Sequence, residues 1–334
     1  MAKIAINGFG RIGRAAFKVA LAHDDIEVVA INDLGDIHNL AYLLRYDSVY
    51  GRYGQEVSVE DEQLVVADKK VKVFQEKDPA KLPWGNLGVD VVLESTGVFT
   101  EKEKAAAHLA GGAKFVIITA PTKSADMPTV VLGVNDKDLA GAQIISNASC
   151  TTNCAAPMIA VLNNAFGVEK ALLTTAHAYT ATQSLVDGPG GKGDFRRGRA
   201  AAINIVPAAT GAAVAATKTI PELAGKFDGV SLRVPVPVVS LSDITALLKK
   251  NVTVAEINQA FQDAAKNPLY EGVLDVTEEE VVSTDFIGNP HSVIMDLQMT
   301  RVVDGNLVKV MGWYDNEWGY SNRLIEQVQA LTQP

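Results

Sequence analysis

The feature that most constrains the fold is a glycine-rich turn between an apolar run and a helix at the start of the chain. Residues 3–7 read Lys-Ile-Ala-Ile-Asn, residues 8–13 read Gly-Phe-Gly-Arg-Ile-Gly, and residues 11–22 have a helical pattern. A second apolar run follows at 28–32. Strand, tight turn, helix and strand in this order form a βαβ unit, which places two parallel strands in one sheet.

The same alternation continues through the first half of the chain. Several runs consist almost entirely of Val and Ile, which is typical of strands covered on both faces. We therefore predict a doubly wound parallel sheet. Its further strands are predicted at 89–95, 115–119, 130–134 and 144–147, and its further helices at 39–44 and 101–110.

Composition limits the function classes. A length of 334 residues predicts about two domains. The formal net charge of −9 argues against nucleic acid and anionic lipid as partners. The start lacks the pattern of a signal peptide, no run is apolar enough to span a membrane, and there are only two cysteines. We expect a soluble, cytoplasmic protein.

The glycine-rich turn also predicts a ligand. The motif G-x-G-x-x-G, with glycines at Gly8, Gly10 and Gly13, lies between a strand and a helix, and Asp33 ends the second strand 20 residues after Gly13. This context is typical of dinucleotide binding, with the pyrophosphate at the helix N-terminus and the acidic residue on the ribose. A carboxylate repels a 2′-phosphate, so the pattern favours NAD over NADP. The alternative is a glycine-rich turn with a solvent-facing aspartate.

After about residue 151 the pattern changes to α+β. Longer strands are predicted at 231–239, 293–303 and 307–314, and Asp304-Gly305 predicts a hairpin between the last two. A final helix is predicted at 317–331. We expect an NAD-binding domain at 1–150, joined by the C-terminal helix 317–334, and a catalytic and substrate-binding domain at 151–316 with a largely antiparallel sheet.

Cys150 is the candidate nucleophile. It lies at the predicted N-terminus of a helix, where the helix dipole stabilises a thiolate and lowers the thiol pKa. Ser149 or Thr151 is available to cap this helix. Pro157 predicts a kink or a later start of the helix. For Cys154, inert core packing is the favoured interpretation.

A nucleophilic thiol needs a base, and the chain has five histidines. His177 is the best candidate because it ends the predicted strand at 171–176. The others have positions where solvent exposure is expected, at the ends of predicted surface helices or in polar turns: His23, His108, His38 and His291.

Cationic and hydroxyl side chains in the second half suggest an anionic ligand. Arg233 lies inside an apolar strand, where a lone guanidinium is costly to bury. A phosphate group would serve as its partner, and an internal carboxylate is the alternative. Further candidates for anion contacts are Thr180, Arg196, Arg197, Arg199, Thr210 and Gly211.

Together these residues resemble the family of phosphorylating glyceraldehyde-3-phosphate dehydrogenases. The matching segments span nearly the whole chain, and the Ser-Cys-Thr-Thr-Asn pentad with its downstream histidine is highly specific. The segments are 6–14, 147–154, 177–180, 207–212, 233–235 and 313–318.

The resemblance implies a Rossmann NAD-binding domain and a chemistry. Cys150 would be the nucleophile and His177 its base, and the substrates would be glyceraldehyde 3-phosphate and inorganic phosphate. The implied NAD contacts are Arg11, Ile12, Asp33, Lys77, Thr119 and Asn316. The implied substrate-phosphate contacts are Thr180 and Arg233, and those to the attacking phosphate are Ser149, Thr151, Thr210, Gly211 and Arg196. The loop at 187–199 would lie at a subunit interface of a homotetramer.

Some residues depart from the family pattern, and two other functions stay open. Ala181-Thr182 stands where Asn-Asp is frequent, and Arg197 adds a second arginine to the loop. One alternative is an enzyme for another aldehyde, such as erythrose 4-phosphate. The other is a catalytically silent NAD-binding protein, since fold alone does not fix function.

Overall fold

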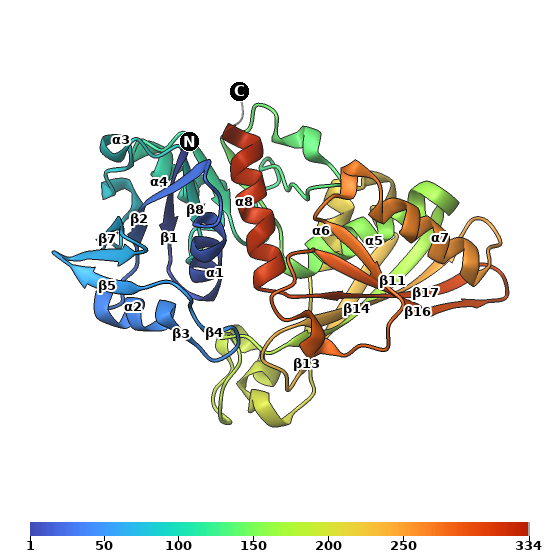
Figure 1. Ribbon diagram of the computed structural model, residues 1–334. Coiled ribbons are helices and arrows are strands. Elements are labelled where there is room, and N and C mark those ends of the chain that lie inside the picture. Colours follow the sequence, from blue (N-terminus) through green and yellow to red (C-terminus); the bar gives the residue numbers. More distant parts are fainter. Residues whose placement is uncertain (333–334) are drawn as a thin grey trace. The chain divides into compact units, whose positions relative to one another are not determined.

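The structure, a computed structural model, describes residues 1–332 (Figure 1). The chain divides into two compact units. The first comprises residues 1–130, 137–148 and 321–332, and the second comprises 131–136 and 149–320.

The first unit contains an eight-stranded sheet in the order β10-β9-β8-β1-β2-β7-β6-β5. From β10 to β7 every pair is parallel, whereas β7-β6 and β6-β5 are antiparallel. The predicted doubly wound parallel sheet is therefore confirmed, with an antiparallel extension that the sequence did not indicate. The strands are β1 Ala2–Asn7, β2 Ile26–Asn32, β5 Val57–Glu60, β6 Gln63–Val66, β7 Lys69–Phe74, β8 Val91–Glu94, β9 Phe115–Ile118 and β10 Ile144–Ser146; β3 Tyr46–Asp47 and β4 Gly51–Arg52 form a separate pair.

Five α-helices belong to this part of the chain. They are α1 Arg11–Ala20, α2 Ile37–Arg45, α3 Trp84–Leu87, α4 Lys102–Ala110 and the C-terminal α8 Trp318–Thr332. In α8, the Gln327 side chain donates to the Val130 carbonyl (3.0 Å), which ties the end of the chain to the first unit. Residues 333 and 334 of the predicted C-terminal helix lie outside the described residues.

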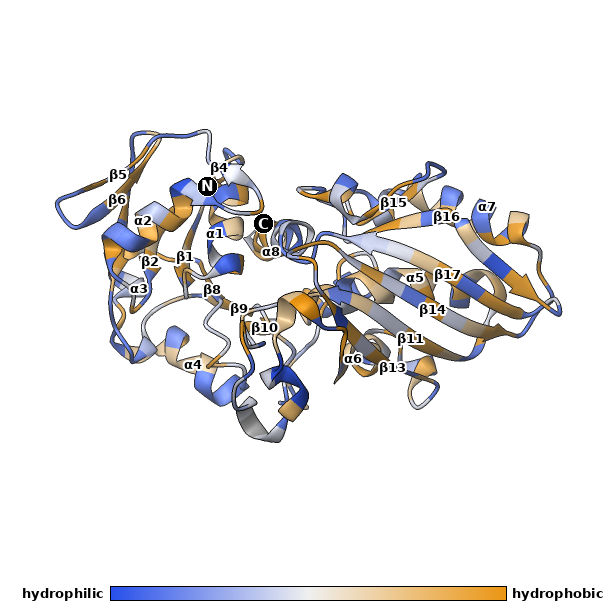
Figure 2. Cartoon of the chain, turned by 90° about the horizontal axis from the view of Figure 1, so that it is seen from below, coloured by the Kyte–Doolittle hydropathy of each residue, from blue (hydrophilic) through white to orange (hydrophobic). Residues whose placement is uncertain are grey.

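The second unit contains a seven-stranded sheet in the order β12-β13-β11-β14-β17-β16-β15. Four of its pairs are antiparallel, and β11-β13 and β15-β16 are parallel. Burial alternates along β14, and Figure 2 shows hydrophilic and hydrophobic residues interspersed along the strands of this sheet. The strands are β11 Val168–Ala178, β12 Val206–Ala209, β13 Phe227–Val234, β14 Ser240–Leu248, β15 Leu274–Thr277, β16 Val293–Val303 and β17 Leu307–Tyr314.

Three helices pack against this sheet: α5 Cys150–Phe166, α6 Ala212–Thr219 and α7 Val254–Ala265. Alternating burial in β14 means that one face of the sheet is covered and the other is more exposed. Short 3₁₀ helices connect the elements, at Pro79–Lys81, Asp136–Leu139, Gly191–Gly193, Phe195–Gly198, Ala201–Ile203, Pro221–Leu223, Pro268–Tyr270 and Ser283–Phe286.

Two sequence predictions are wrong for a local reason. Residues 130–134 form no strand, and 132–134 form a turn. The Asn135 side chain accepts from Val131 N (2.8 Å), a local bond that competes with strand pairing. The strand predicted at 231–239 ends at Val234, because two prolines follow that cannot donate to a ladder.

The predicted hairpin is confirmed, and one of the two interpretations of Pro157 is wrong. Asp304 and Gly305 have φ of 49° and 79°, as a tight hairpin turn requires, and β16 pairs antiparallel with β17. Helix α5 runs without interruption through Pro157, so the later start considered from the sequence is wrong.

Candidate active site

Cys150 is the first residue of α5. Ser149 is the N-cap, and its Oγ accepts from the backbone N–H of Thr152 (3.0 Å). Of the two capping residues considered from the sequence, Ser149 therefore caps the helix. Cys154, one turn later in the same helix, is fully buried, and its Sγ lies 3.8 Å from both the Met158 sulfur and the Gly312 carbonyl oxygen.

The structure brings Cys150 and His177 together. The distance from Cys150 Sγ to His177 Nε2 is 3.5 Å. His177 lies near the end of β11, and its register partner in the neighbouring parallel strand β13 is Arg233. The thiol, the imidazole and the guanidinium thus belong to one cluster, and strand pairing places two of its three members.

Arg233 and a backbone carbonyl compete for the other nitrogen of His177. Arg233 Nη1 lies 2.6 Å from His177 Nδ1 and donates to the Ala178 carbonyl (3.0 Å). That carbonyl is also 2.7 Å from Nδ1. When Nδ1 carries the proton and donates to the carbonyl, Nε2 presents a lone pair toward the thiol, which is the tautomer that a general base needs.

Burial dominates the electrostatics of this cluster. Burial and the Arg233 charge together lower the pKa of His177 to about 3, against the opposing effect of the hydrogen bond to the Ala178 carbonyl. Burial raises the pKa of the Cys150 thiol, while Arg233 and hydrogen bonds involving Thr151 oppose that rise. The lowered thiol pKa expected from the helix N-terminus is therefore wrong for this state. The resting pair is a thiol beside a neutral imidazole.

A chain of hydroxyl groups lies behind the pair, and sequence reasoning did not identify it. Tyr314 Oη is 2.8 Å from Thr151 Oγ1 and 2.9 Å from Thr175 Oγ1, and its ring meets that of His177 edge to face at 6.1 Å between centroids. Burial raises the pKa of the Tyr314 hydroxyl. Tyr314 ends β17 and lies within the family-matching segment 313–318, so its position in that segment at a strand end was the available signal.

Ser240 links the pair to Asn316. Its Oγ accepts from Ala178 N (3.1 Å) and donates to Asn316 Oδ1 (2.9 Å), and both Ser240 and Asn316 are buried. The sequence singled out Asn316 only through the family resemblance and gave no indication of Ser240. The amide of Asn316 is thereby held in one orientation within the second unit.

The predicted anion contacts are only partly assembled. Thr152 Oγ1 donates to the Ala212 carbonyl (3.4 Å), which brings the N-termini of α5 and α6 together. This places Ser149 and Thr151 near the start of α6, where Gly211 is the N-cap and Thr210 Oγ1 accepts from Ala212 N (3.2 Å).

The three arginines of the loop at 187–199 differ in their contacts. Arg196 is exposed, whereas Arg197 forms an ion pair with Asp194 (2.8 Å) and donates to Thr182 (3.2 Å). Thr180 Oγ1 is 2.9 Å from Thr182 Oγ1. Arg199 is paired with Asp187 (2.9 Å).

Arg233 lacks the internal carboxylate partner that the sequence left open. Within residues 1–332, its contacts are His177 and a carbonyl, and its buried Nε has no hydrogen-bond partner. A guanidinium with a buried, unused donor is a strong feature of an anion site, because leaving such a donor unpaired is costly.

A separate cavity of about 420 Å³ lies in the first unit, at the carboxyl ends of β1, β2 and β8. This is where ligands bind in doubly wound sheets. Its lining includes the predicted Gly8, Gly10, Asp33 and Lys77, and Leu34, which resembles the NAD-specific members of the family. It also includes residues that the sequence did not indicate: Asn7, Asn32, Glu76, Ser95, Thr96, Val98 and Phe99.

Comparison with known proteins decides the family. A model described as "Glyceraldehyde 3-phosphate dehydrogenase, NAD binding domain" matches residues 2–102, and one described as "Glyceraldehyde 3-phosphate dehydrogenase, C-terminal domain" matches residues 149–316. The chain belongs to the glyceraldehyde-3-phosphate dehydrogenase family. Members of this family are NAD-dependent oxidoreductases, and this chain is one of them.

Relatives in the glyceraldehyde-3-phosphate dehydrogenase family match over nearly their whole length. A glyceraldehyde-3-phosphate dehydrogenase of Clostridium pasteurianum is 52% identical over 333 residues, covering 98% of each chain. One of Clostridium acetobutylicum is 53% identical over 329 residues, covering 97% of each chain. Glyceraldehyde-3-phosphate dehydrogenase B of Aspergillus oryzae is 52% identical over 326 residues, covering 97% of this chain and 96% of its own.

The residues of the first unit fit the NAD of a glyceraldehyde-3-phosphate dehydrogenase. Gly8 has φ of +93°, and a Cβ there would lie 2.7 Å from Thr96 N; a Cβ on Gly13 would lie 2.1 Å from Gly8 O. Only glycines therefore permit the tight turn that opens α1. Asp33, at the end of β2, accepts from Phe9 N (2.7 Å) and Gly35 N (2.8 Å) and retains lone pairs for ribose hydroxyls.

The other residues implied by the family resemblance lie outside the cavity lining. Arg11 and Ile12 begin α1 beside the glycine turn, and the Arg11 side chain is paired with Asp47 (2.7 Å). Thr119 follows β9, where its N–H donates to the Glu94 carbonyl (3.0 Å). Asn316 belongs to the second unit.

Two kinds of feature are absent from residues 1–332. No cluster of three or more His, Cys, Asp and Glu side chains is placed to hold a metal ion. None of the helices in the described part of the chain combines the length and apolar character needed to cross a membrane.

Proposed function

We propose that Cys150 and His177 carry out the oxidative phosphorylation of D-glyceraldehyde 3-phosphate to 1,3-bisphosphoglycerate, with NAD and inorganic phosphate as co-substrates. The observation that carries this assignment is the 3.5 Å approach of Cys150 Sγ to His177 Nε2 beside Arg233, a half-buried arginine with no carboxylate partner among residues 1–332. A thiol, a base and an anion-binding group in one cluster are what acyl transfer through a thioester requires.

The first step forms a C–S bond. His177 Nε2 takes the proton of Cys150 as the sulfur attacks the aldehyde carbon. It then passes this proton to the aldehyde oxygen, which gives a thiohemiacetal and returns His177 to its neutral form. A neutral imidazole, kept so by burial, is ready to act as this base.

The second step is oxidation of the thiohemiacetal. When bound, NAD supplies the acceptor for the hydride that leaves the substrate carbon. His177 takes the hydroxyl proton at Nε2, so that the carbon becomes the carbonyl of a thioester on Cys150. A phosphate oxygen then attacks this carbonyl, the C–S bond breaks, and the sulfur recovers a proton from His177.

Anion contacts follow from the cluster. Thr180 and Arg233 would hold the phosphate of the substrate, supported by the unpartnered Arg233 Nε. The attacking phosphate would use the residues at the adjoining starts of α5 and α6 together with the loop arginine: Ser149, Thr151, Thr210, Gly211 and Arg196.

NAD contacts are assigned on the same basis. Backbone groups at the start of α1 would bind the pyrophosphate, and Asp33 would bind the adenosine ribose. The full set is Gly8, Gly10, Arg11, Ile12, Gly13, Asp33, Lys77, Thr119 and, for the nicotinamide carboxamide, Asn316. In this assignment residues 1–150 with 317–334 form the NAD-binding domain and residues 151–316 the catalytic domain.

The assembly we propose is a homotetramer in the cytoplasm. Large apolar side chains on the loop between β11 and β12 support a subunit interface there, since a single chain leaves them open to water. Leu185, Phe195 and Ile203 are 81%, 82% and 80% exposed.

The test is NADH formation from glyceraldehyde 3-phosphate and NAD, with and without inorganic phosphate, in the wild type and in Cys150→Ser. We expect turnover that depends on phosphate and is lost in the variant. Cys154→Ser is the matched control, because Cys154 lies one turn away and is fully buried. Turnover that survives in Cys150→Ser contradicts the proposal. Higher kcat/KM with erythrose 4-phosphate favours the other aldehyde, and NAD binding without turnover favours the silent NAD-binding protein.

A further inference from the structure

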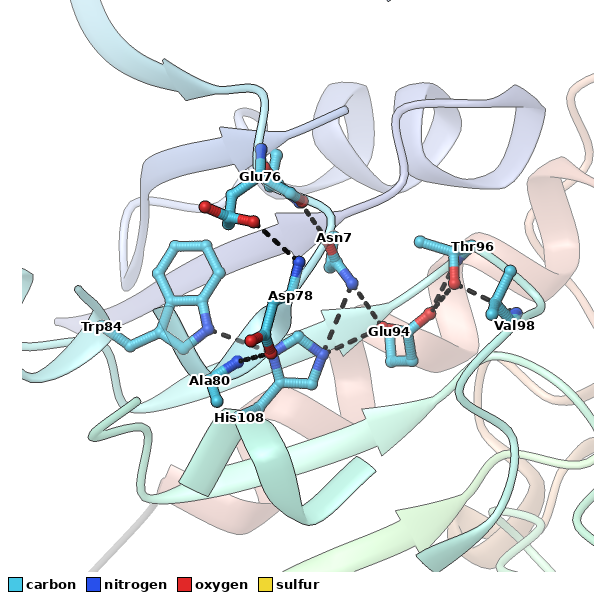
Figure 3. A network of polar contacts seen from close by, with 10 residues as sticks. Asn7, Glu76, Asp78, Ala80, Trp84, Glu94, Thr96, Val98 and His108 are labelled. Atoms are coloured by element: carbon cyan, nitrogen blue, oxygen red, sulfur yellow. Dashed lines mark hydrogen bonds and ion pairs between the residues drawn. The ribbon is translucent and has the colours of Figure 1, made fainter. Parts of the chain in front are cut away.

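A buried polar network lies beneath the cavity of the first unit and takes no part in the proposed chemistry (Figure 3). Its central residues are Glu94 and His108, whose side chains are both completely buried. Glu94 ends β8, Asn7 ends β1 and Asn32 ends β2, and these three strands are neighbours in the sheet. The network therefore runs across the carboxyl ends of the strands, where the cavity opens.

Glu94 accepts from four donors and donates to none. Its Oε2 accepts from Asn7 Nδ2 (2.6 Å) and from His108 Nε2 (2.9 Å). Its Oε1 accepts from the backbone N–H of Thr96 (2.9 Å) and from the Thr96 hydroxyl. A carboxylate is the side chain that matches this arrangement, because both of its oxygens are acceptors only.

The indole of Trp84 determines the tautomer of His108. Trp84 Nε1 lies 3.0 Å from His108 Nδ1, and an indole nitrogen can only donate. His108 Nδ1 is therefore an acceptor without a proton, and the single ring proton is on Nε2, where it points at Glu94. His108 is thus a neutral imidazole with both nitrogens paired.

Asn32 and Glu76 fix the polarity of the network at its other end. Asn32 Oδ1 accepts from Glu76 N (2.8 Å), and Asn32 Nδ2 donates to Glu76 O (2.9 Å) and to Asn7 Oδ1 (2.7 Å). Backbone atoms cannot exchange donor for acceptor, so neither Asn32 nor Asn7 can turn its amide round. Asn7 must then donate to Glu94.

The ends of this network form part of the cavity wall. Asn7, Asn32, Glu76, Thr96 and Val98 all line the cavity. The Thr96 hydroxyl, bonded to Glu94, also accepts from Val98 N (3.1 Å), so the carboxylate determines the course of the chain after β8.

We propose that Glu94 and His108 are positioning residues for the dinucleotide pocket, and that they act by fixing the donor and acceptor pattern of the cavity wall. The proposal rests on the proposed function, which places NAD in this cavity. Neither residue contacts the cavity itself; they act through Asn7, Asn32 and Thr96. The Trp84 indole fixes the donor and acceptor pattern at one end of the network, and the Glu76 backbone fixes it at the other. The side chain at the centre must therefore accept hydrogen bonds through both of its oxygens, as Glu94 does.

The first test is Glu94→Gln, which changes one acceptor oxygen into a donor at nearly constant volume. In either orientation the new amide faces donors that cannot turn, Thr96 N–H on one side or Asn7 and His108 on the other. We expect the dissociation constant for NAD, measured by calorimetry, to rise at least about tenfold, the cost of a buried unpaired polar group. We expect kcat at saturating NAD and the alkylation rate of Cys150 to change by less than about twofold, because Cys150 belongs to the other unit.

A compensating exchange sharpens the test. Adding Asn7→Asp to Glu94→Gln swaps the amide and the carboxylate and keeps the same number of donors and acceptors. The amide introduced on β8 then donates to the carboxylate introduced on β1, and His108 Nε2, which lies 3.4 Å from Asn7 Nδ2 in the wild type, turns its proton to that carboxylate. We expect the double variant to bind NAD within about threefold of the wild type, although Asn7→Asp alone brings two carboxylates together and weakens binding.

A surface variant keeps the proposal testable where Glu94→Gln does not fold. Thr96 is exposed, so Thr96→Val removes the hydroxyl without a core defect, and Thr96→Ser restores it. We expect the dissociation constant for NAD to rise about threefold in Thr96→Val and to be unchanged in Thr96→Ser. Without NAD, ¹⁵N spectra of the wild type should show His108 protonated at Nε2 only, and a perturbed Trp84 indole signal in Glu94→Gln.

The outcomes separate the two proposals. Wild-type protein that neither binds nor reduces NAD overturns the proposed function. Wild-type protein that binds NAD, with Glu94→Gln binding it equally well, overturns the positioning role alone. Equal losses of NAD binding, kcat and Cys150 alkylation in Glu94→Gln, or a double variant as weak as the two single variants combined, also overturn it.

Discussion

Two buried polar clusters in this molecule contain a histidine, and they are built in opposite ways. In the Glu94–His108 network of the first unit, each histidine nitrogen and each carboxylate oxygen has a hydrogen-bond partner of the right polarity. In the catalytic cluster of the second unit, His177 faces a thiol at 3.5 Å, and two groups compete for its other nitrogen. The Glu94–His108 network allows only one arrangement of donors and acceptors. The hydrogen bonds of the catalytic cluster can rearrange when a ligand binds.

The charged groups of the two clusters also differ in how fully they are paired. Glu94 receives four hydrogen bonds, two of them from neighbouring side chains on other strands and helices. Arg233 is a half-buried cation that contacts an imidazole and a carbonyl, and within residues 1–332 its buried Nε has no hydrogen-bond partner. A fully paired network stabilises and positions, whereas an incompletely paired one is ready to bind an anion and transfer a proton. Four predictions test this contrast, in order of decreasing effect.

The largest effect is expected from His177→Asn. Removing the base leaves the Cys150 thiol protonated, because burial holds its pKa above the ordinary value. We expect kcat to fall about a thousandfold, the usual size of a lost general base. The measurement is phosphate-dependent NADH formation at saturating NAD. The dissociation constant for NAD should stay unchanged, and a fall in kcat below about tenfold would mean that another group takes the proton.

The second prediction concerns how the free energy of unfolding depends on pH. The folded-state pKa of His177 is about 3, below its ordinary value of 6.5. As pH falls from 6.5 towards 3, the unfolded chain binds a proton that the folded chain does not, so stability decreases through this window. At about pH 4 the loss is about 3 kcal/mol relative to pH 7.

His177→Gln removes this titration, so its free energy of unfolding should change less between about pH 7 and pH 4 than that of the wild type. Urea unfolding at the two pH values measures the difference. His38→Gln is the matched control, because His38 is exposed on the first unit. Equal pH dependence in the wild type and His177→Gln would contradict a buried neutral His177.

The Cys150–His177 pair was predicted from the sequence, and the Glu94–His108 network was not. The strand–turn–helix order and the hairpin at Asp304-Gly305 follow from local rules. Cys150 and His177 were chosen from their positions at a predicted helix start and strand end, and the family resemblance then supported the pair. His108 was expected to be exposed because it lies near the end of a helix, yet its side chain is completely buried. The expectation was wrong because Glu94 and Trp84, which surround it, are distant in sequence, and spacing within one helix carries no information about them.

The same limit applies to the electrostatics of the catalytic cluster. The helix N-terminus at Cys150 suggested a lowered thiol pKa, but burial by other elements raises it. The position of Arg233 beside His177 comes from the register of β11 and β13, which are joined by a long crossover. Strands can be predicted from sequence more readily than the register between them. Here the register of β11 and β13 is what places Arg233 beside His177.

A third prediction separates anion binding from effects on His177. In Arg233→Lys the charge is kept, but the planar guanidinium, whose Nη1 reaches both His177 and the Ala178 carbonyl, is lost. We expect kcat/KM for glyceraldehyde 3-phosphate to fall about thirtyfold, the size of one or two lost hydrogen bonds to a charged group. Glyceraldehyde without the phosphate is the control substrate, and its kcat/KM should change less than about threefold. Equal losses with both substrates would mean that Arg233 acts through His177 instead.

The smallest effect tests whether the Glu94–His108 network has a single state. Trp84→Phe removes the indole donor and leaves the aromatic packing, so His108 Nδ1 loses its hydrogen bond from Trp84. We expect the free energy of unfolding to decrease by about 1 kcal/mol, measured by urea unfolding, as for one buried hydrogen bond. The ring proton of His108 is then free to occupy either nitrogen, and ¹⁵N spectra should show both tautomers. In that background Glu94→Gln should weaken NAD binding less than in the wild type, because His108 Nε2 can now accept from the new amide. An unchanged penalty would mean that the indole does not determine the polarity of the network.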